Sequence, residues 1–214
     1  MFENVVFSIG RLIDDIYYAS GTCTLLNKQN LLVTAAHVVN GSNKNLFIRL
    51  NTNYESGYQD TTIQQSKLIP VEIEAIDPLR DLCILSLQGD VSAQSNIELE
   101  KADGTNPGEV VTVIGFPHSN LGRIVLTQQS CEVGAKILLS SKGIKSKHFV
   151  LNIQARPGQS GGPVIRTSDG TLIGILIGAY VPTIEGGISL GGIDPQTLHQ
   201  TTHAVSASYL ERML

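Results

Sequence analysis

The sequence predicts an all-β protein, because short apolar runs recur between Gly, Asn, Asp and Pro, and few long stretches have helical spacing. Glycine, which accepts turn conformations that other residues avoid, occurs 21 times in the 214 residues. A chain of this length forms one or two domains with a large buried core. The runs predicted as strands are Val5–Ile9, Cys23–Leu26, Leu31–Ala36, Leu46–Leu50, Val71–Ile76, Leu82–Leu87, Val110–Gly115, Ile124–Gln128, Phe149–Ile153, Val164–Ile165 and Leu172–Ala179.

Three further segments have predictions of their own. Lys136–Lys147 carries lysines interrupted by Ser and Gly, which predicts a solvated surface loop. Leu172–Val181 is an apolar stretch of ten residues, too short to span a bilayer, and is interpreted as a buried strand. Ser206–Leu214 has the apolar spacing of one short helix at the end of the chain.

The segment Arg156–Pro163 surrounds a single serine, Ser160, with glycine at three of the four nearest positions. A serine hydroxyl becomes a nucleophile only beside a general base. Acyl transfer also needs backbone N–H groups aimed at the oxygen that becomes negative, and glycines let the backbone fold tightly around that oxygen. The segment is therefore either a plain turn or a nucleophile turn, depending on whether a base and an orienting acid occur elsewhere.

A histidine and an aspartate stand upstream, each beside an apolar run. His37 follows a run that ends in two alanines, which leave room for an imidazole packed over a cleft. Asp81 directly precedes another apolar run, and Asp77 competes with it for the role of orienting acid. Separately, such a histidine is usually structural and such an aspartate is usually a turn or cap residue. Together with Ser160 they supply a nucleophile, a base and an acid.

The motifs Thr34–His37, Asp81–Leu85 and Gly158–Pro163 follow one another in the order His, Asp, Ser. In these motifs the chain resembles the chymotrypsin-like (trypsin-fold) serine peptidases, in particular the HtrA-type bacterial and viral-like members, without a PDZ domain. α/β-Hydrolases and subtilisins have other orders. The resemblance spans nearly the whole chain, from the first strand near Val5 to the final segment.

The resemblance implies a role for each motif residue. Ser160 attacks the scissile carbonyl while His37 takes its proton, and Asp81 fixes the histidine tautomer. The backbone N–H groups of Gly158 and Ser160 form the oxyanion hole. Neither a metal nor an organic cofactor is expected.

The resemblance also implies two packed six-stranded antiparallel β-barrels with a cleft between them, and a short C-terminal helix. The polar segment Asp90–Pro107, which contains Gly and Pro, is the natural connection. We therefore expect an N-terminal barrel over residues 1–95, carrying the histidine and the aspartate. A linker over 96–107 leads to a C-terminal barrel over 108–214, which carries the serine and the helix.

Gln159 stands directly before Ser160, where secreted members of this family commonly have an aspartate that pairs with a new N-terminus. A neutral amide cannot form that ion pair, so activation by insertion of an N-terminus is not expected. We expect instead a turn that is preformed, or that is remodelled by a partner or a neighbouring domain.

Substrate preference also follows from the resemblance. The residues expected around the primary specificity pocket are Gln154, Ala155, Ile177, Gly178, Ala179, Thr202 and His203, with Ala204 as an alternative to Thr202. None carries a carboxylate, so a preference for Arg or Lys is not expected, and an aliphatic or small uncharged side chain fits best. His203 either recognises an acidic side chain or points away from the pocket through strand alternation.

Composition limits the compartment and the partners. The three cysteines, Cys23, Cys83 and Cys131, are odd in number and widely separated, which argues against a disulfide framework or a metal site. The N-terminus lacks a basic region followed by an apolar core, so no secretory signal is expected. These features favour a cytoplasmic setting. The net charge of −4 argues against nucleic acid as the main partner, and no membrane association is expected.

The sequence thus predicts a serine endopeptidase acting on protein or peptide substrates through an acyl-enzyme. It is either freestanding or a protease module regulated by a partner or an adjacent domain. One alternative is a catalytically silent binding or scaffold module with the same fold, and a smaller one is a hydrolase of other esters. Intact His37, Asp81, Ser160 and Gly158 favour the peptidase.

Overall fold

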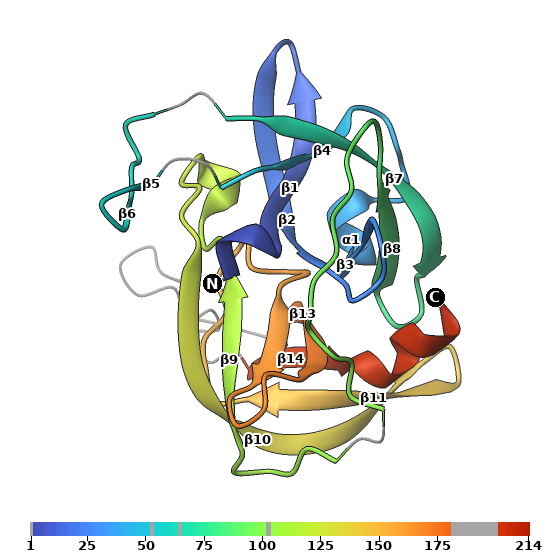
Figure 1. The fold of residues 1–214 in the computed structure, drawn as a ribbon. Helices are drawn as coiled ribbons and strands as arrows, with labels where there is room; N and C mark the ends of the chain where they lie inside the picture. Colours follow the sequence, from blue (N-terminus) through green and yellow to red (C-terminus); the bar gives the residue numbers. More distant parts are fainter. Residues whose placement is uncertain (1, 52–53, 64–65, 102–103, 181–200) are drawn as a thin grey trace, which may run out of the picture.

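Two closed six-stranded antiparallel barrels, one above the other in Figure 1, form the body of the protein. This computed structural model describes residues 2–51, 54–63, 66–101, 104–180 and 201–214. The first barrel has the strand order β1 (Val6–Ile13), β2 (Ile16–Leu25), β3 (Leu31–Ala35), β8 (Leu82–Leu87), β7 (Leu68–Asp77) and β4 (Leu46–Arg49). The second has β10 (Thr127–Ser141), β11 (Ile144–Leu151), β14 (Thr201–Ser206), β13 (Leu172–Tyr180), β12 (Pro163–Arg166) and β9 (Val110–Gly115). The predicted all-β, two-barrel fold is confirmed.

The remaining elements are short. They are η1 (Phe2–Asn4), α1 (Ala36–Val39), η2 (Ser119–Leu121), η4 (Ala207–Arg212) and a two-stranded sheet of β5 (Tyr54–Glu55) and β6 (Tyr58–Gln59). The predicted C-terminal helix is present as the 3₁₀ helix η4, and the Ser206 hydroxyl caps it by accepting a hydrogen bond from Ser208 N–H. Among the described residues, no helix has the length and apolar character needed to cross a membrane.

Apolar runs such as Leu31–Ala35 form strands that are buried on both faces. The predicted run Ile124–Gln128 differs, because β10 begins only at Thr127. In β3, Leu32 packs into the core of the first barrel, whereas its neighbour Val33 packs into a second cluster that includes Ile114 and Val205 of the other barrel. A strand buried on both faces reads as a continuous apolar run rather than an alternating one. This shared cluster fixes the two barrels against each other, and the segment that leaves β3 therefore lies at their junction.

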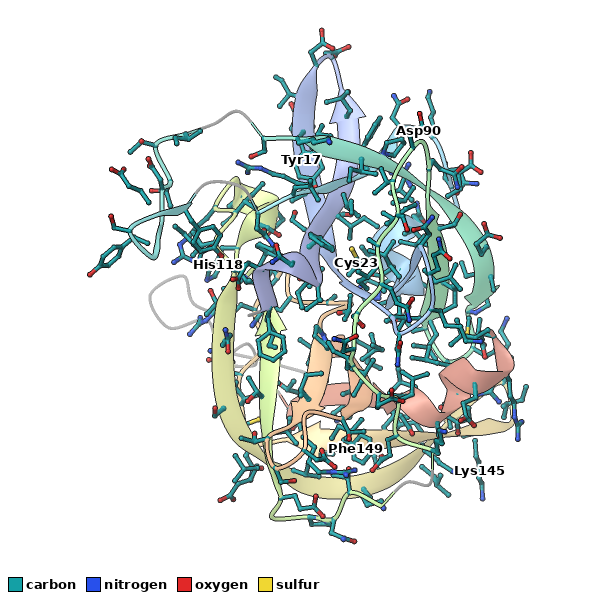
Figure 2. The ribbon with its side chains drawn as sticks, viewed as in Figure 1. Tyr17, Cys23, Asp90, His118, Lys145 and Phe149 are labelled. Atoms are coloured by element: carbon teal, nitrogen blue, oxygen red, sulfur yellow. The ribbon has the colours of Figure 1, made fainter. Side chains whose placement is uncertain are left out.

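The lysine-rich segment Lys136–Lys147 is not the loop that the sequence predicts. Lys136 lies in β10, Lys145 and Lys147 lie in β11, and the turn is made by Lys142 and Gly143, both with positive φ (48° and 79°). Two such residues form the tight turn that suits a β-hairpin. The prediction failed because this hairpin lacks an unbroken apolar face, although its backbone groups are paired across the strands. Figure 2 shows Lys145 near the end of the hairpin.

The chain between Leu87 and Val110 runs from one barrel to the other and attaches to both (Figure 1). Asn30 N–H donates to Ala93 O at 2.8 Å, and Leu172 N–H donates to Glu98 O at 2.8 Å. The linker bounds at 95/96 and 107/108 stay a prediction, because backbone pairing on both sides spreads the connection over a longer stretch.

A buried charged pair secures this connection to β12, and it leads to a stability prediction. Arg166, six residues after Ser160, bonds Glu100, whose side chain is only 5% exposed, and donates to Thr105 Oγ1 at 2.9 Å. Removing one partner of a buried pair strands the other charge, so Arg166→Leu should lower the free energy of unfolding by about 3–5 kcal/mol. Urea denaturation measures this loss, with exposed Arg123→Leu as the control. A loss below about 1 kcal/mol would mean that the pair behaves like a surface salt bridge.

Candidate active site

His37 and Asp81 meet at the junction of the barrels. The histidine lies in α1, the single turn that follows β3, and Asp81 directly precedes β8, which pairs with β3. His37 Nδ1 is 2.6 Å from Asp81 Oδ2, and the His37 backbone N–H donates to Asp81 Oδ1 at 2.8 Å. The carboxylate therefore binds both the ring and the backbone of the histidine. A proton held on Nδ1 leaves Nε2 as the free acceptor of the ring.

The competing aspartate, Asp77, is engaged elsewhere. Its Oδ1 accepts hydrogen bonds from the N–H groups of Leu79 and Arg80, and its Oδ2 lies 2.5 Å from Arg80 Nη1. Asp77 therefore shapes the turn between β7 and β8. The structure brings Asp81, and not Asp77, to His37.

Ser160 follows a tight four-residue turn formed by Arg156–Gln159. We call the segment Arg156–Ser160 the serine turn. Gln159 N–H donates to Arg156 O at 3.1 Å, which closes the turn. Proline occupies the second position and Gly158, with φ of +94°, the third, which are the features of a type II turn. A Cβ on Gly158 would lie 2.4 Å from Phe116 O and from Ser119 Oγ, so glycine is required for space as well as for conformation.

Every backbone carbonyl from Arg156 to Ser160 accepts a hydrogen bond. Two of these bonds come from Thr22 in β2, which reaches across from the first barrel, and one comes from His118 N–H at the start of η2. Figure 2 shows His118 near the junction of the barrels. The bonds are Arg156 O with Gln159 N (3.1 Å), Pro157 O with His118 N (2.7 Å), Gly158 O with Thr22 Oγ1 (2.8 Å), Gln159 O with Gly162 N (3.0 Å) and Ser160 O with Thr22 N (2.8 Å).

In contrast to the carbonyls, two of the N–H groups of the serine turn have no hydrogen-bond partner in the described part of the chain. Within the described residues, Gly158 N–H and Ser160 N–H donate to no protein acceptor, whereas those of Gln159, Gly161 and Gly162 do. N–H and C=O point in opposite directions in a trans peptide, so the Pro157 carbonyl bound to His118 directs Gly158 N–H to the other side. Gly158 is buried and Ser160 is half-buried, so these two donors are left to bind water or a ligand.

The serine turn packs directly against the histidine segment. A Cβ on Gly161 would lie 2.1 Å from Thr22 O and 3.0 Å from Ala35 N, and one on Gly21 would lie 2.8 Å from Ser160 O. Gly161, directly after Ser160, thus lies beside Ala35, the last residue before α1. Among the described residues, Ser160 Oγ makes no hydrogen bond to His37 Nε2. Such contacts are often long without substrate and shorten when it binds.

Thr22, His118 and Gln129 contribute to this site and were not identified from the sequence. Thr22 is a buried threonine in a strand, which usually indicates packing alone. His118 acts through its backbone N–H, which no side-chain pattern reveals. Gln129, on β10, bonds the side chain of Gln159. In the sequence, the Gly and Pro of Gly115-Phe116-Pro117 are the one signal of a special turn before His118. In the structure, His118 has a left-handed conformation there (φ 63°).

The expected pocket residues adjoin one another on three segments. In the β13–β14 register, Gly178 lies opposite His203 and Ala179 opposite Thr202. The Thr202 hydroxyl accepts from Ala155 N–H at 2.9 Å and donates to Ile153 O, so it holds the segment before the serine turn.

The other expected pocket residues differ in exposure. Gln154 is exposed, whereas Ile177 is half-buried and packs against the core of the first barrel and against the cluster shared by the two barrels. His203 is half-buried, and burial lowers its pKa. Their role in binding a substrate stays a prediction.

A second histidine, His148 on β11, is buried in this region and makes stability depend on pH. Its Nε2 lies 2.8 Å from Ser146 Oγ, and burial, reinforced by nearby His203 and opposed by Asp81, lowers its pKa from 6.5 to about 4. Between these values the unfolded chain binds the proton and the folded chain does not, so stability falls as the pH drops from 6.5 to 4. His148→Leu should flatten this slope in urea titrations at several pH values. An unchanged slope would contradict the assignment.

Comparisons with known proteins identify the family. Residues 21–175, which include His37, Asp81 and Ser160, match the trypsin-like peptidase domain. Among curated proteins, the chain is 29% identical over 158 residues to the uncharacterized protein y4bJ of Sinorhizobium fredii. That match covers 74% of this chain but 22% of y4bJ, so the chain spans about a fifth of the length of this relative.

Solved structures show the same fold. The MamO protease domain from Magnetospirillum magneticum is 17% identical, with a TM-score of 0.70 over 99% of this chain and 96% of that one. The active form of the Rv3671c protease from M. tuberculosis is 22% identical (TM-score 0.67; 99% and 80% covered). The HtrA-type protease AlgW with a tripeptide is 20% identical (TM-score 0.66; 99% and 59% covered). With a family match from β2 to β13 and this shared fold, the chain belongs to the trypsin-like peptidase domain family.

Proposed function

We propose that this chain is a serine endopeptidase. The observation that carries the proposal is the hydrogen bonding of the serine turn: all five carbonyls from Arg156 to Ser160 are occupied, while the N–H groups of Gly158 and Ser160 have no acceptor among the described residues. Two free donors beside a serine are what a tetrahedral oxyanion requires. A turn with only a structural role would have no reason to leave these two donors open.

In the proposed reaction, Ser160 Oγ attacks the scissile carbonyl and His37 Nε2 takes its proton. Asp81 keeps the other ring proton on Nδ1 and stabilises the imidazolium that forms. The carbonyl oxygen becomes negative and is held by the N–H groups of Gly158 and Ser160. His37 then protonates the leaving amine, and water releases the acyl group by the same steps in reverse order.

The proposed substrate is a protein or peptide. The related fold of AlgW is described with a tripeptide and with a decapeptide, which supports peptide binding by this architecture. The greater length of the relative y4bJ supports a protease module within a larger protein. The three cysteines are free thiols, and burial raises the pKa of Cys83 to about 12, which makes it unreactive. Free thiols support our proposal of a reducing, cytoplasmic setting.

A fluorophosphonate probe tests the proposal, because only an activated serine attacks its phosphorus, displaces fluoride and becomes phosphonylated. The wild-type chain should be labelled, and Ser160→Ala should remove all labelling. Ser168→Ala, which changes an exposed serine in the β12–β13 turn, is the matched control and should label like the wild type. An unlabelled wild-type chain would instead support a silent binding module.

Cleavage preference gives a separate prediction. Because no carboxylate stands among the expected pocket residues, proteome-derived peptides should be cut after aliphatic or small uncharged side chains. Mass spectrometry of the products measures this preference, and digestion by Ser160→Ala supplies the background. Dominant cleavage after Arg or Lys would refute the proposed pocket.

A further inference from the structure

Gln159 is fully buried, and its side-chain amide is bonded on both sides. Its Oε1 accepts a hydrogen bond from Arg156 N–H at 2.8 Å, and its Nε2 donates to Gln129 Oε1 at 2.9 Å. The direction of these bonds is fixed, because a backbone N–H can only donate and must therefore face the oxygen of the amide. We call this series, from Arg156 N–H through Gln159 to Gln129, the amide chain.

The amide chain closes the serine turn from both sides. Gln159 binds the C=O of Arg156 through its backbone N–H at 3.1 Å, and it binds the N–H of Arg156 through its side chain. Arg156 and Gln159, the first and last residues of the four-residue turn, are thus held together by two hydrogen bonds. Gln129 lies opposite Val113 in the β9–β10 register, so the amide chain ends on a strand of the second barrel.

With its ends held, the turn still has two forms. Types I and II differ by a flip of the central peptide, here the one between Pro157 and Gly158. The bond from His118 N–H to Pro157 O selects type II. That bond requires the Pro157 carbonyl to lie in a fixed position relative to His118 N–H. The amide chain fixes this position, because it holds Arg156 and Gln159 on either side of the central peptide.

We propose that Gln129 and Gln159 are positioning residues that hold the serine turn in its type II form through bonds between neutral amides. The two open N–H groups are then presented in the resting chain, with no ion pair and no new N-terminus. This inference rests on the proposed function for its consequence in turnover. The hydrogen bonding of the amide chain itself is open to measurement without turnover.

The test exploits the direction of the Gln129 bond. Gln129→Glu keeps an acceptor for Gln159 Nε2, whereas Gln129→Lys, of comparable reach, presents a donor to a donor. The Gln159 amide then has either an unmet donor or a reversed orientation that sets its NH₂ against Arg156 N–H. Leaving a buried polar group without a hydrogen-bond partner has a free-energy cost. For Gln129→Lys this cost corresponds to a fall in kcat of about 10- to 100-fold, with KM little changed. We expect Gln129→Glu to stay within about threefold of the wild type. Gln128→Lys, at the exposed neighbouring position, should have no effect.

Hydrogen exchange provides the readout that does not require activity. In a Ser160→Ala background, the Arg156 amide should exchange slowly in the parent and in Gln129→Glu, and faster in Gln129→Lys. Equal exchange and equal turnover in Gln129→Glu and Gln129→Lys would overturn the inference. If the wild type is not labelled by the fluorophosphonate probe, the proposed function fails, but slow exchange in Gln129→Glu against fast exchange in Gln129→Lys would still support the amide chain. A thermal unfolding scan of each variant confirms that it is folded.

Discussion

Asp81→Asn is expected to lower kcat on a peptide substrate by about 10⁴-fold while leaving the fold intact. The reason lies in the two bonds of the carboxylate. Asp81 Oδ1 accepts the His37 backbone N–H, so an asparagine must place its oxygen there and its NH₂ towards His37 Nδ1. A donor facing Nδ1 stabilises the tautomer with the proton on Nε2. That tautomer cannot accept the proton of Ser160.

Steady-state kinetics and the rate of fluorophosphonate labelling measure this effect. Asp77→Asn is the matched control, since Asp77 bonds Arg80 and the adjacent backbone and does not reach His37. It should retain kcat within about threefold, because the side-chain amide oxygen can still accept the turn bonds. If the two variants lost activity equally, Asp81 would have no special relation to the histidine. A lower melting temperature for Asp81→Asn alone would mean that the variant reports on stability.

The sequence was sufficient to predict the fold, and it singled out His37, Asp81 and Ser160, whose catalytic roles stay a proposal. Runs such as Leu31–Ala35 are apolar on both faces, and this pattern arises when a strand is buried between two cores. Asp81 was favoured over Asp77 by its place directly before a strand, and the structure places it against His37. These features are local, so a short stretch of sequence contains them.

The partners of the serine turn could not be predicted, because they come from distant parts of the chain. Thr22 Oγ1 bonds Gly158 O across 136 residues, and nothing around Thr22 distinguishes it from Thr24, which is also buried. Gln159 indicated the absence of an ion pair, but not its partner Gln129. The lysines of the β10–β11 hairpin led to a wrong prediction of a loop, because polar residues on exposed strands have the same sequence pattern as a loop.

The orientation of the Gly158 peptide leads to the second large effect, the loss of turnover in Gly158→Ala. A Cβ at this position would lie 2.4 Å from Phe116 O, and the φ of +94° is one that alanine rarely adopts. The type I form of the turn relieves both problems, because its third residue has negative φ, and the bond from Gln159 N–H to Arg156 O is retained. That form turns Gly158 N–H away from the serine. Loss of one oxyanion donor should lower kcat by about 10²–10³-fold, with a small change in KM.

Gly170→Ala is the control that separates the effect of the positive φ from the effect of the place of Gly158 beside the serine. Gly170 also has positive φ, +75°, in the β12–β13 turn, but a Cβ there would meet nothing within 4 Å. Gly170→Ala should lose about 1 kcal/mol of stability from its left-handed backbone. Gly158→Ala should lose a similar amount, about 1 kcal/mol, because the flip to the type I form breaks the bond from His118 N–H to Pro157 O. Only Gly158→Ala should lose turnover. Urea denaturation and peptide kinetics on the two proteins measure these quantities. Wild-type kcat in Gly158→Ala would mean that the Gly158 N–H does not contact the oxyanion, and the hole would then have to be formed by Ser160 N–H with a donor outside the turn.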